Sequence, residues 1–308
     1  MPKDEDRELF RTLPPRLRLP LSRCTRGELP NNVALTHLFM AARDAAEAKT
    51  ALVDALNEAR QCDAAAAERL SRSLDLWEHT PEAFATVSEV LRAVGRHGLD
   101  MAAEDAAAHW AAAFDRAAGI SPEASVALYS LGRPDLLARI TAEIVEWMRA
   151  SELLWPGCVA LDIGCGNGRM LHALAPETQL VVGIDVSSAM LSAARARCVD
   201  CDNIRLVRGT GYDLSTFADE RFDLVYAVDV FPYLVRSGLA HCHLREAARV
   251  LKPGGRLLIF NYSYRGDADA DRDEISVLAS CSDLAVVKAG SREFALWDAL
   301  PFLMKRVR

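Results

Sequence analysis

The sequence predicts an α/β protein in which a doubly wound, mostly parallel sheet follows an all-helical N-terminal half. Residues 1–150 are rich in alanine and carry apolar residues at helical spacing, and no strand pattern appears before residue 158. After residue 155, short apolar runs alternate with helical segments, as in parallel sheets with helices on both faces. Two final apolar runs, joined by a short link, predict an antiparallel pair at the sheet edge.

The helical half has recognisable starts and stops. Residues 80–82 and 121–123 read Thr-Pro-Glu and Ser-Pro-Glu, which places a hydroxyl at an N-cap and proline at the first helical position. Apolar spacing predicts helices over 83–94 and 101–118, and an amphipathic helix over 134–150 that leads into the first strand.

The sheet half should contain seven strands and three crossover helices. The last crossover helix ends at Lys252-Pro253-Gly254-Gly255, which indicates a turn that launches the fifth strand. We therefore expect a helical domain or lid over residues 1–130 and a second domain over 131–308, with its core at 155–308. Strands are expected over 159–163, 180–184, 204–207, 223–230, 256–260, 284–288 and 302–307, and helices over 168–175, 188–197 and 238–250.

Composition narrows the class of partner. The chain has 308 residues, with 36 Lys and Arg against 43 Asp and Glu, so its net charge is −7. This charge disfavours a broad phosphate-binding surface, and no nucleic-acid partner is expected. The start of the chain lacks an apolar signal core, and no run approaches the ~18 apolar residues of a membrane span. The eight cysteines form no disulfide framework, and Cys198 and Cys201 have metal-ligand spacing but no second pair, which favours a cytoplasmic protein with no metal site.

A glycine turn follows the first predicted strand. Leu161-Asp162-Ile163 is followed by glycine at positions 164, 166 and 168. Glycine lets a strand turn sharply into a helix and lets backbone N–H groups approach a ligand closely. The spacing is GxGxG and not the GxGxxG of dinucleotide sites, because Arg169 occupies the position of that motif's third glycine. The spacing therefore disfavours an NAD oxidoreductase.

Preceded by an acid and followed by a second strand that ends in Asp185, this turn resembles the first motif of class I S-adenosylmethionine-dependent methyltransferases. Residues 221–225 (Arg-Phe-Asp-Leu-Val) and 246–255 resemble that family's landmarks around strands four and five. The resemblance spans about half of the chain and does not extend to residues 1–130. It implies a seven-stranded, Rossmann-like methyltransferase sheet with an antiparallel last strand, and S-adenosyl-L-methionine as the cofactor.

The resemblance also implies a cofactor site at the carboxyl ends of the first strands. The glycine turn would pass the methionine part, whose ammonium group Asp162 would hold, and Asp185 would accept both ribose hydroxyls. The alternative for Asp185 is a helix cap, and for Met190 it is core packing. Where the family often has an acid against adenine, this chain has Thr210, and Asp213 is the alternative. The predicted cofactor-binding residues are Asp162, Gly164, Cys165, Gly166, Gly168, Asp185, Val186, Met190, Thr210, Gly211 and Val228.

The acceptor is expected beyond strands four and five. The sulfonium already makes the methyl group an electrophile, so the protein mainly has to align a nucleophile and exclude water. Residues 228–234 invite comparison with the Asn/Asp-Pro-Pro-Tyr motif of amino-group methyltransferases, but Val230 and Phe231 occupy its first two positions. Asp229 and Tyr233 remain candidates to orient or deprotonate an acceptor, and helix capping is the alternative for Asp229.

Three further tyrosines are candidates for the acceptor site. Tyr262 and Tyr264 alternate after strand five, so at most one should point inward. Tyr129 precedes the helix that leads into strand one, where related enzymes fold over cofactor and acceptor; a buried core role is its alternative.

The helical half is expected to form a roof, although a dimerisation module, and hence a homodimer, would have the same sequence signature. The sequence thus predicts a methyltransferase acting on an oxygen or nitrogen atom of a small-molecule acceptor. Two alternatives stay open: a methyltransferase of a protein or tRNA, and a non-catalytic S-adenosylmethionine-binding regulatory protein.

Overall fold

A computed structural model describes residues 9–95 and 103–307. It contains a seven-stranded sheet in the order β3-β2-β1-β4-β5-β7-β6, in which only β7 runs antiparallel to its neighbours. The predicted α/β architecture and the antiparallel last strand are therefore confirmed. The strands are β1 (Val159–Ile163), β2 (Leu180–Asp185), β3 (Ile204–Arg208), β4 (Phe222–Val228), β5 (Leu251–Phe260), β6 (Leu284–Ala289) and β7 (Pro301–Arg306).

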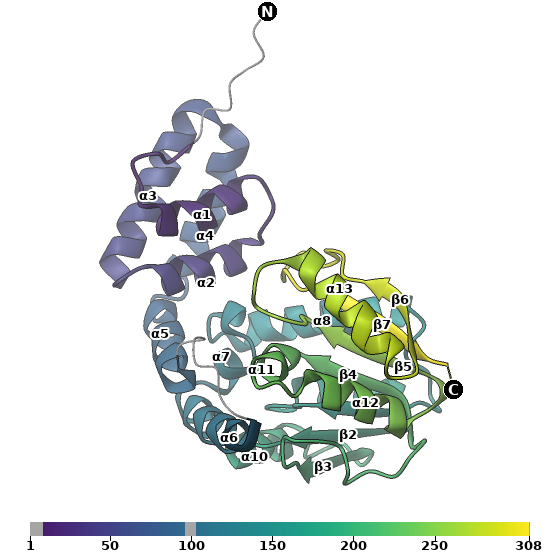
Figure 1. Cartoon of the computed structure of the whole chain (residues 1–308). Coiled ribbons are helices and arrows are strands. Elements are labelled where there is room, and N and C mark those ends of the chain that lie inside the picture. The colour runs from purple at the N-terminus through teal and green to yellow at the C-terminus, as the bar shows by residue number, and fades with distance from the viewer. Residues whose placement is uncertain (1–8, 96–102, 308) are drawn as a thin grey trace, which may run out of the picture.

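Helices cover both faces of the sheet, as the apolar strands require (Figure 1). On one face lie α8 (Pro134–Ala150), α9 (Arg169–Leu174) and α10 (Ser188–Arg197), which bury side chains such as Ile140, Leu171 and Leu191. On the other lie α11 (Phe231–Arg236), α12 (Ala240–Val250) and α13 (Ala268–Ser280), which bury Leu244 and Ile275. The amphipathic helix predicted over 134–150 is confirmed.

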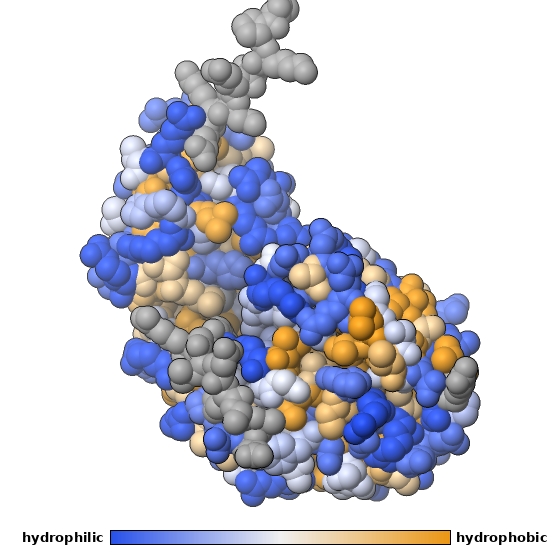
Figure 2. Space-filling model, in the orientation of Figure 1, coloured by the Kyte–Doolittle hydropathy of each residue, from blue (hydrophilic) through white to orange (hydrophobic). Residues whose placement is uncertain are grey.

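The helical half has two parts (Figure 1). Four helices, α1 (Pro15–Thr25), α2 (Asn31–Ala41), α3 (Ala45–Cys62) and α4 (Ala64–Glu78), share a core that includes Phe39 and Trp77. Two more, α5 (Ala83–Val94) and α6 (Ala103–Ile120), form an arm that runs down to the sheet domain. Figure 2 shows apolar side chains gathered in the angle between this arm and the sheet domain.

A carboxylate fastens the arm to the sheet domain. Asp115 of α6 accepts hydrogen bonds from Ser187 Oγ at 2.5 Å and from Ala189 N at 2.9 Å, at the N-terminus of α10. These donors include a backbone N–H that has no partner within the helix, and the positive end of the helix dipole favours the negative charge. The short α7 (Pro122–Val126) and a 3-10 turn, η1 (Leu128–Ser130), then lead into α8.

Some predicted boundaries were wrong, each for a local reason. Residues 252–255 form no separate turn, because β5 already begins at Leu251 and absorbs them in a register shift against β4. Strand four ends at residue 228 and not 230, because Asp229 is left-handed (φ 58°). Thr80 is not an N-cap; α5 begins at Ala83, and Thr80 Oγ1 accepts from Arg133 Nη1 at 3.3 Å.

Ser121 does cap α7, accepting from Ala124 N at 3.1 Å. The start of the helix predicted over 101–118 lies outside the described residues, and the described part ends at Ile120. Helix α13 was not predicted. Among residues 9–95 and 103–307, no helix has the length and apolarity needed to cross a bilayer.

Candidate active site

The carboxyl ends of β1, β2 and β4 open into a cavity of about 670 Å³. Its floor comes from the strand ends and its roof from α2, α5, α6 and the segment around η1. Ligands of doubly wound sheets bind outside these strand ends, where the strand order reverses. The volume lies within the range of small-molecule sites.

The glycine turn has no room for side chains. Gly164 and Gly166 are left-handed, with φ of 68° and 51°. A Cβ on Gly164 would lie 2.4 Å from Val230 Cγ2, and one on Gly166 would lie 2.6 Å from Val126 Cγ1. The turn is therefore enclosed between the end of β4 and helix α7. Gly164 and Gly166 line the cavity, whereas Cys165 is buried and Gly168 faces Ala194 of α10.

Asp185 ends β2 and lines the same cavity. Its Oδ2 accepts from Gly166 N and its Oδ1 from Ser187 N, both at 2.8 Å. Burial raises the pKa of Asp185, and the backbone donors oppose that rise. The N-cap of α10 is Ser187, which accepts from Met190 N at 3.0 Å. Asp185 is thus not the helix cap, and its carboxylate is fixed beside the glycine turn.

Asp162 lies beneath the turn and does not line the cavity. Asp162 is only 2% exposed, and burial raises the pKa of its carboxyl group well above the usual range. It lies in register with Tyr226 of β4. The Tyr226 hydroxyl faces this carboxyl group and opposes the rise of its pKa.

The remaining predicted cofactor residues divide into two groups. Val186, Met190, Gly211 and Val228 line the cavity. Thr210 does not: it is exposed, and its Oγ1 accepts from Tyr212 N at 3.3 Å. The neighbouring Gly209 and Asp213, the alternative to Thr210, both line the cavity.

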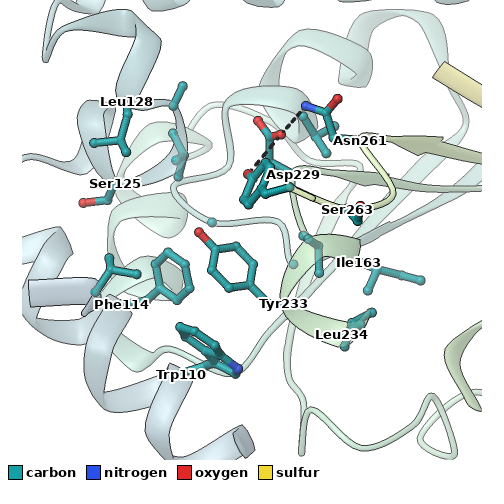
Figure 3. Close-up of a pocket in the computed structure, with 18 of the residues that line it drawn as sticks. Trp110, Phe114, Ser125, Leu128, Ile163, Asp229, Tyr233, Leu234, Asn261 and Ser263 are labelled. Carbon is teal, nitrogen blue, oxygen red and sulfur yellow. Dashed lines mark hydrogen bonds between the residues drawn. The ribbon is translucent and has the colours of Figure 1, made fainter. Parts of the chain in front are cut away.

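Asp229 and Asn261 stand at the ends of the adjacent strands β4 and β5 (Figure 3). Both are left-handed, with φ of 58° and 61°, a conformation that costs a residue with a side chain about 1 kcal/mol or more. Asn261 Nδ2 donates to Asp229 Oδ1 at 2.8 Å. Such strained residues are concentrated at functional sites, where the surroundings hold them in place.

Two of the predicted tyrosines converge on this carboxylate. The Tyr129 hydroxyl donates to Asp229 Oδ2 at 2.9 Å, and the Tyr264 hydroxyl donates to Oδ1 at 3.3 Å. Burial raises the pKa of Asp229 to about 6, although the bonds from Asn261 and Tyr129 oppose the rise. Asp229 therefore titrates near neutral pH, which suits proton transfer.

The other two predicted tyrosines lie in different surroundings. Tyr233 lines the cavity among aromatic rings, with centroids 4.7 Å from Trp110 and 5.3 Å from Phe114, both on α6 (Figure 3). Tyr262 is fully buried in the core, donates to Glu274 Oε1 at 2.7 Å and does not line the cavity. Only Tyr264 of the alternating pair points into the cavity.

Sequence reasoning missed several residues of the cavity. Asn261 had a signal, since it opens the polar segment after strand five. The sequence gives no signal for Trp110, His37 or Trp297. Helices α6 and α2 and the loop before β7, which carry them, reach the cavity only through tertiary packing. Trp297 is 2% exposed and stacks on Tyr129 with ring centroids 5.3 Å apart.

Comparisons with known proteins agree with this geometry. A family model described as a methyltransferase domain matches residues 161–259. A demethylmenaquinone methyltransferase of Corynebacterium kroppenstedtii is 41% identical over 108 residues, which are 35% of this chain and 43% of that protein. Methyltransferase GfsG of Streptomyces halstedii is 33% identical over 140 residues, 42% of this chain and 46% of the relative. A probable tRNA methyltransferase 9B of Homo sapiens is 32% identical over 121 residues, 37% of this chain and 24% of that protein.

Among solved structures, phosphoethanolamine N-methyltransferase 1 of Haemonchus contortus, in complex with phosphoethanolamine and S-adenosylhomocysteine, has the same fold. It is 18% identical, with a TM-score of 0.50 over 67% of this chain and 50% of that one. The curated matches span less than half the length of each relative.

The sheet domain is thus a Rossmann-like methyltransferase domain. It resembles class I S-adenosylmethionine-dependent methyltransferases in fold, and the family match covers residues 161–259.

Proposed function

We propose that this chain is an S-adenosylmethionine-dependent methyltransferase that methylates an oxygen or nitrogen atom of a small-molecule acceptor. One observation carries the proposal: a single cavity joins the glycine turn and Asp185 to the Asp229 network, beneath a roof of helices. Enclosure excludes water and selects small ligands.

The residues at the β1–β2 end fit the nucleoside cofactor. The Gly164 position is a cradle that a Cβ would fill, which keeps the backbone accessible. Asp185 is fixed by two backbone donors, so its remaining lone pairs are aimed and can accept ribose hydroxyls. Val186, Met190 and Gly211 would pack against the base, and Asp162 would act on the ammonium group through the turn. When bound, the cofactor supplies an electrophilic methyl group.

The residues at the β4–β5 end fit the acceptor. Asp229, held by Tyr129 and Asn261, would orient the nucleophilic atom and take its proton where one must leave. Tyr233 and Tyr264 would line the acceptor. We also propose that residues 1–130 act as the lid, while α8 belongs to the second domain, because its Ile140 and Ile144 are part of the core of the sheet.

Calorimetry with S-adenosylhomocysteine tests the cofactor, and a labelled-methyl assay on a metabolite extract tests the acceptor. We expect binding, and label in the small-molecule fraction. Label on protein or tRNA alone would favour the macromolecular alternative, which the tRNA methyltransferase relative keeps open. Binding without transfer to any fraction would favour a regulatory protein. Absence of binding would contradict the proposal.

A further inference from the structure

The cavity adjoins a second hollow on the group of helices α1 to α4, which we call the helical module. Arg23, His37 and Met40 border both the main cavity and a smaller hollow of about 270 Å³ between α1 and α2. Two apolar side chains at this smaller hollow are exposed to solvent, Leu19 by 59% and Met40 by 45%. The helical module thus offers an apolar route from the surface to His37.

His37 and Asp298 differ from the other titratable residues of the cavity. Within the described ranges, each of the other lining side chains that can carry a charge has a partner in the protein, as Asp229 has in Tyr129 and Asn261. His37 and Asp298 line the cavity, and no hydrogen bond or ion pair within the described residues satisfies either one. Polar groups that face a cavity without a protein partner are free to bind a polar group of a ligand, which points to a ligand that uses them.

The two residues are held in fixed positions. Asn32 of α2 is 2% exposed, and its Nδ2 donates to Tyr129 O and Leu296 O, both at 2.9 Å. This single amide ties the helix that carries His37 to the loop that carries Asp298. It also ties both to Tyr129, which donates to Asp229.

Burial favours a neutral His37 ring. Burial lowers the pKa of His37; the negative charge of Asp298 opposes this, and the positive charge of Arg23 adds to it. A neutral imidazole has one donor and one acceptor nitrogen, and a carboxylate only accepts. Together they can bind a hydroxyl group, which both donates and accepts. The nearby rings of Tyr129, Trp297 and Tyr233 are suited to an apolar ring compound.

We propose that His37 and Asp298 bind a hydroxyl group of the methyl acceptor, an apolar ring compound that enters between α1 and α2. This inference rests on the proposed function, since it concerns the acceptor of the same cavity. The hydroxyl site is shared between His37 of α2 and Asp298 of the loop before β7, which explains why the N-terminal helices belong to the active site and are more than a cover.

The test uses 2-naphthol and 2-methylnaphthalene, which have similar shape and differ in the hydroxyl group. Affinities are measured by calorimetry on the full chain saturated with S-adenosylhomocysteine. We expect the wild type to bind 2-naphthol about tenfold more tightly, as one net hydrogen bond predicts. His37→Ala and Asp298→Ala should each remove this preference and leave affinity for S-adenosylhomocysteine unchanged. His79→Ala, at an exposed histidine that follows α4, is the matched control and should keep the preference.

The outcomes separate the inference from the proposed function. A wild type that binds S-adenosylhomocysteine but shows no preference between the naphthalenes overturns the inference, as does a preference that survives both substitutions. Should His37→Ala lose S-adenosylhomocysteine binding through misfolding, Asp298→Ala decides alone. Met40→Trp should slow association of both naphthalenes at least several-fold by filling the route, as stopped-flow mixing measures, and an unchanged association rate would overturn the route. Failure of the wild type to bind S-adenosylhomocysteine counts against the proposed function itself.

Discussion

The two ends of the cavity are built in different ways. At the β1–β2 end, Asp185 accepts from backbone N–H groups only 19 and 2 residues away. At the β4–β5 end, Asp229 accepts from side chains 100 and 32 residues away. The first end is fixed by main chain and glycine, so it should tolerate almost no added atoms. The second depends on side chains from separate elements, so its variants should change pKa values and stability by smaller steps.

The largest effect is expected for Gly164→Ala. The new Cβ would lie 2.4 Å from Val230 Cγ2, in a backbone conformation that disfavours side chains. Overpacking and the left-handed φ together cost about 2–5 kcal/mol, which we expect to appear as lower stability and a loss of S-adenosylhomocysteine affinity of more than about 100-fold. Thermal unfolding and calorimetry measure both.

Gly238→Ala is the matched control for this substitution. Gly238 has nearly the same φ, 67°, but a Cβ at this position would have no atom within 4 Å. The variant should lose only about 1 kcal/mol of stability and keep its affinity. Equal losses in the two variants would show that the close packing of the turn is unimportant.

Asp185→Ala should have the next largest effect. It removes the acceptor proposed for two ribose hydroxyls, each bond contributing about 1.5–3 kcal/mol, so affinity for S-adenosylhomocysteine should fall at least about 100-fold. Calorimetry measures the change. Asp200→Ala removes an exposed acid after α10 and should leave affinity unchanged. Retention of wild-type affinity by Asp185→Ala would refute the ribose assignment.

Asp229→Asn should change the pH dependence of stability. The folded pKa is about 6, above the value of about 3.9 for an unfolded Asp, so the folded state holds this proton more tightly. The wild type therefore loses about 2–3 kcal/mol from this group as the pH rises from about 4 to above 6. The variant lacks that loss and should gain stability relative to the wild type over the same range. Urea unfolding at several pH values measures the difference; parallel curves would contradict it.

Tyr129→Phe should have the smallest effect. It removes one bond to a carboxylate that keeps its bonds from Asn261 and Tyr264, so stability should fall by about 1 kcal/mol. Because the Tyr129 bond lowers the pKa of Asp229, that pKa should rise further above its value of about 6. Carboxyl NMR titration measures the shift. Tyr262→Phe removes a similar bond, to Glu274, away from the cavity and should leave the Asp229 pKa in place.

These two ends also differ in how far the sequence predicts them. The turn at Gly164 and the acid at Asp185 were identified because strand, glycine and acid follow one another within a short segment. Local backbone geometry alone is enough to place Gly164 and Asp185 at the cavity. Thr210 was predicted to bind the cofactor but is exposed and does not line the cavity. The sequence shows that a loop follows β3 but not the direction in which its side chains point.

The acceptor end was predicted only in part. Asp229 and Tyr129 were candidates, but their hydrogen bond depends on how the arm and the sheet domain dock. Asp115 and Asn32, which fix that docking, look like ordinary helix residues in the sequence. Helix α13 was missed because its apolar stripe is narrow, with Ile275 and Ala279 among several acids. Tertiary contacts, and not local propensity, place these residues.

A crystal structure with S-adenosylhomocysteine tests the central claim most directly. We predict that the nucleoside lies in the cavity, with its ribose hydroxyls within hydrogen-bonding distance of Asp185 and its sulfur facing Asp229. A nucleoside bound elsewhere, or a cavity that stays empty at saturating concentration, would contradict the account.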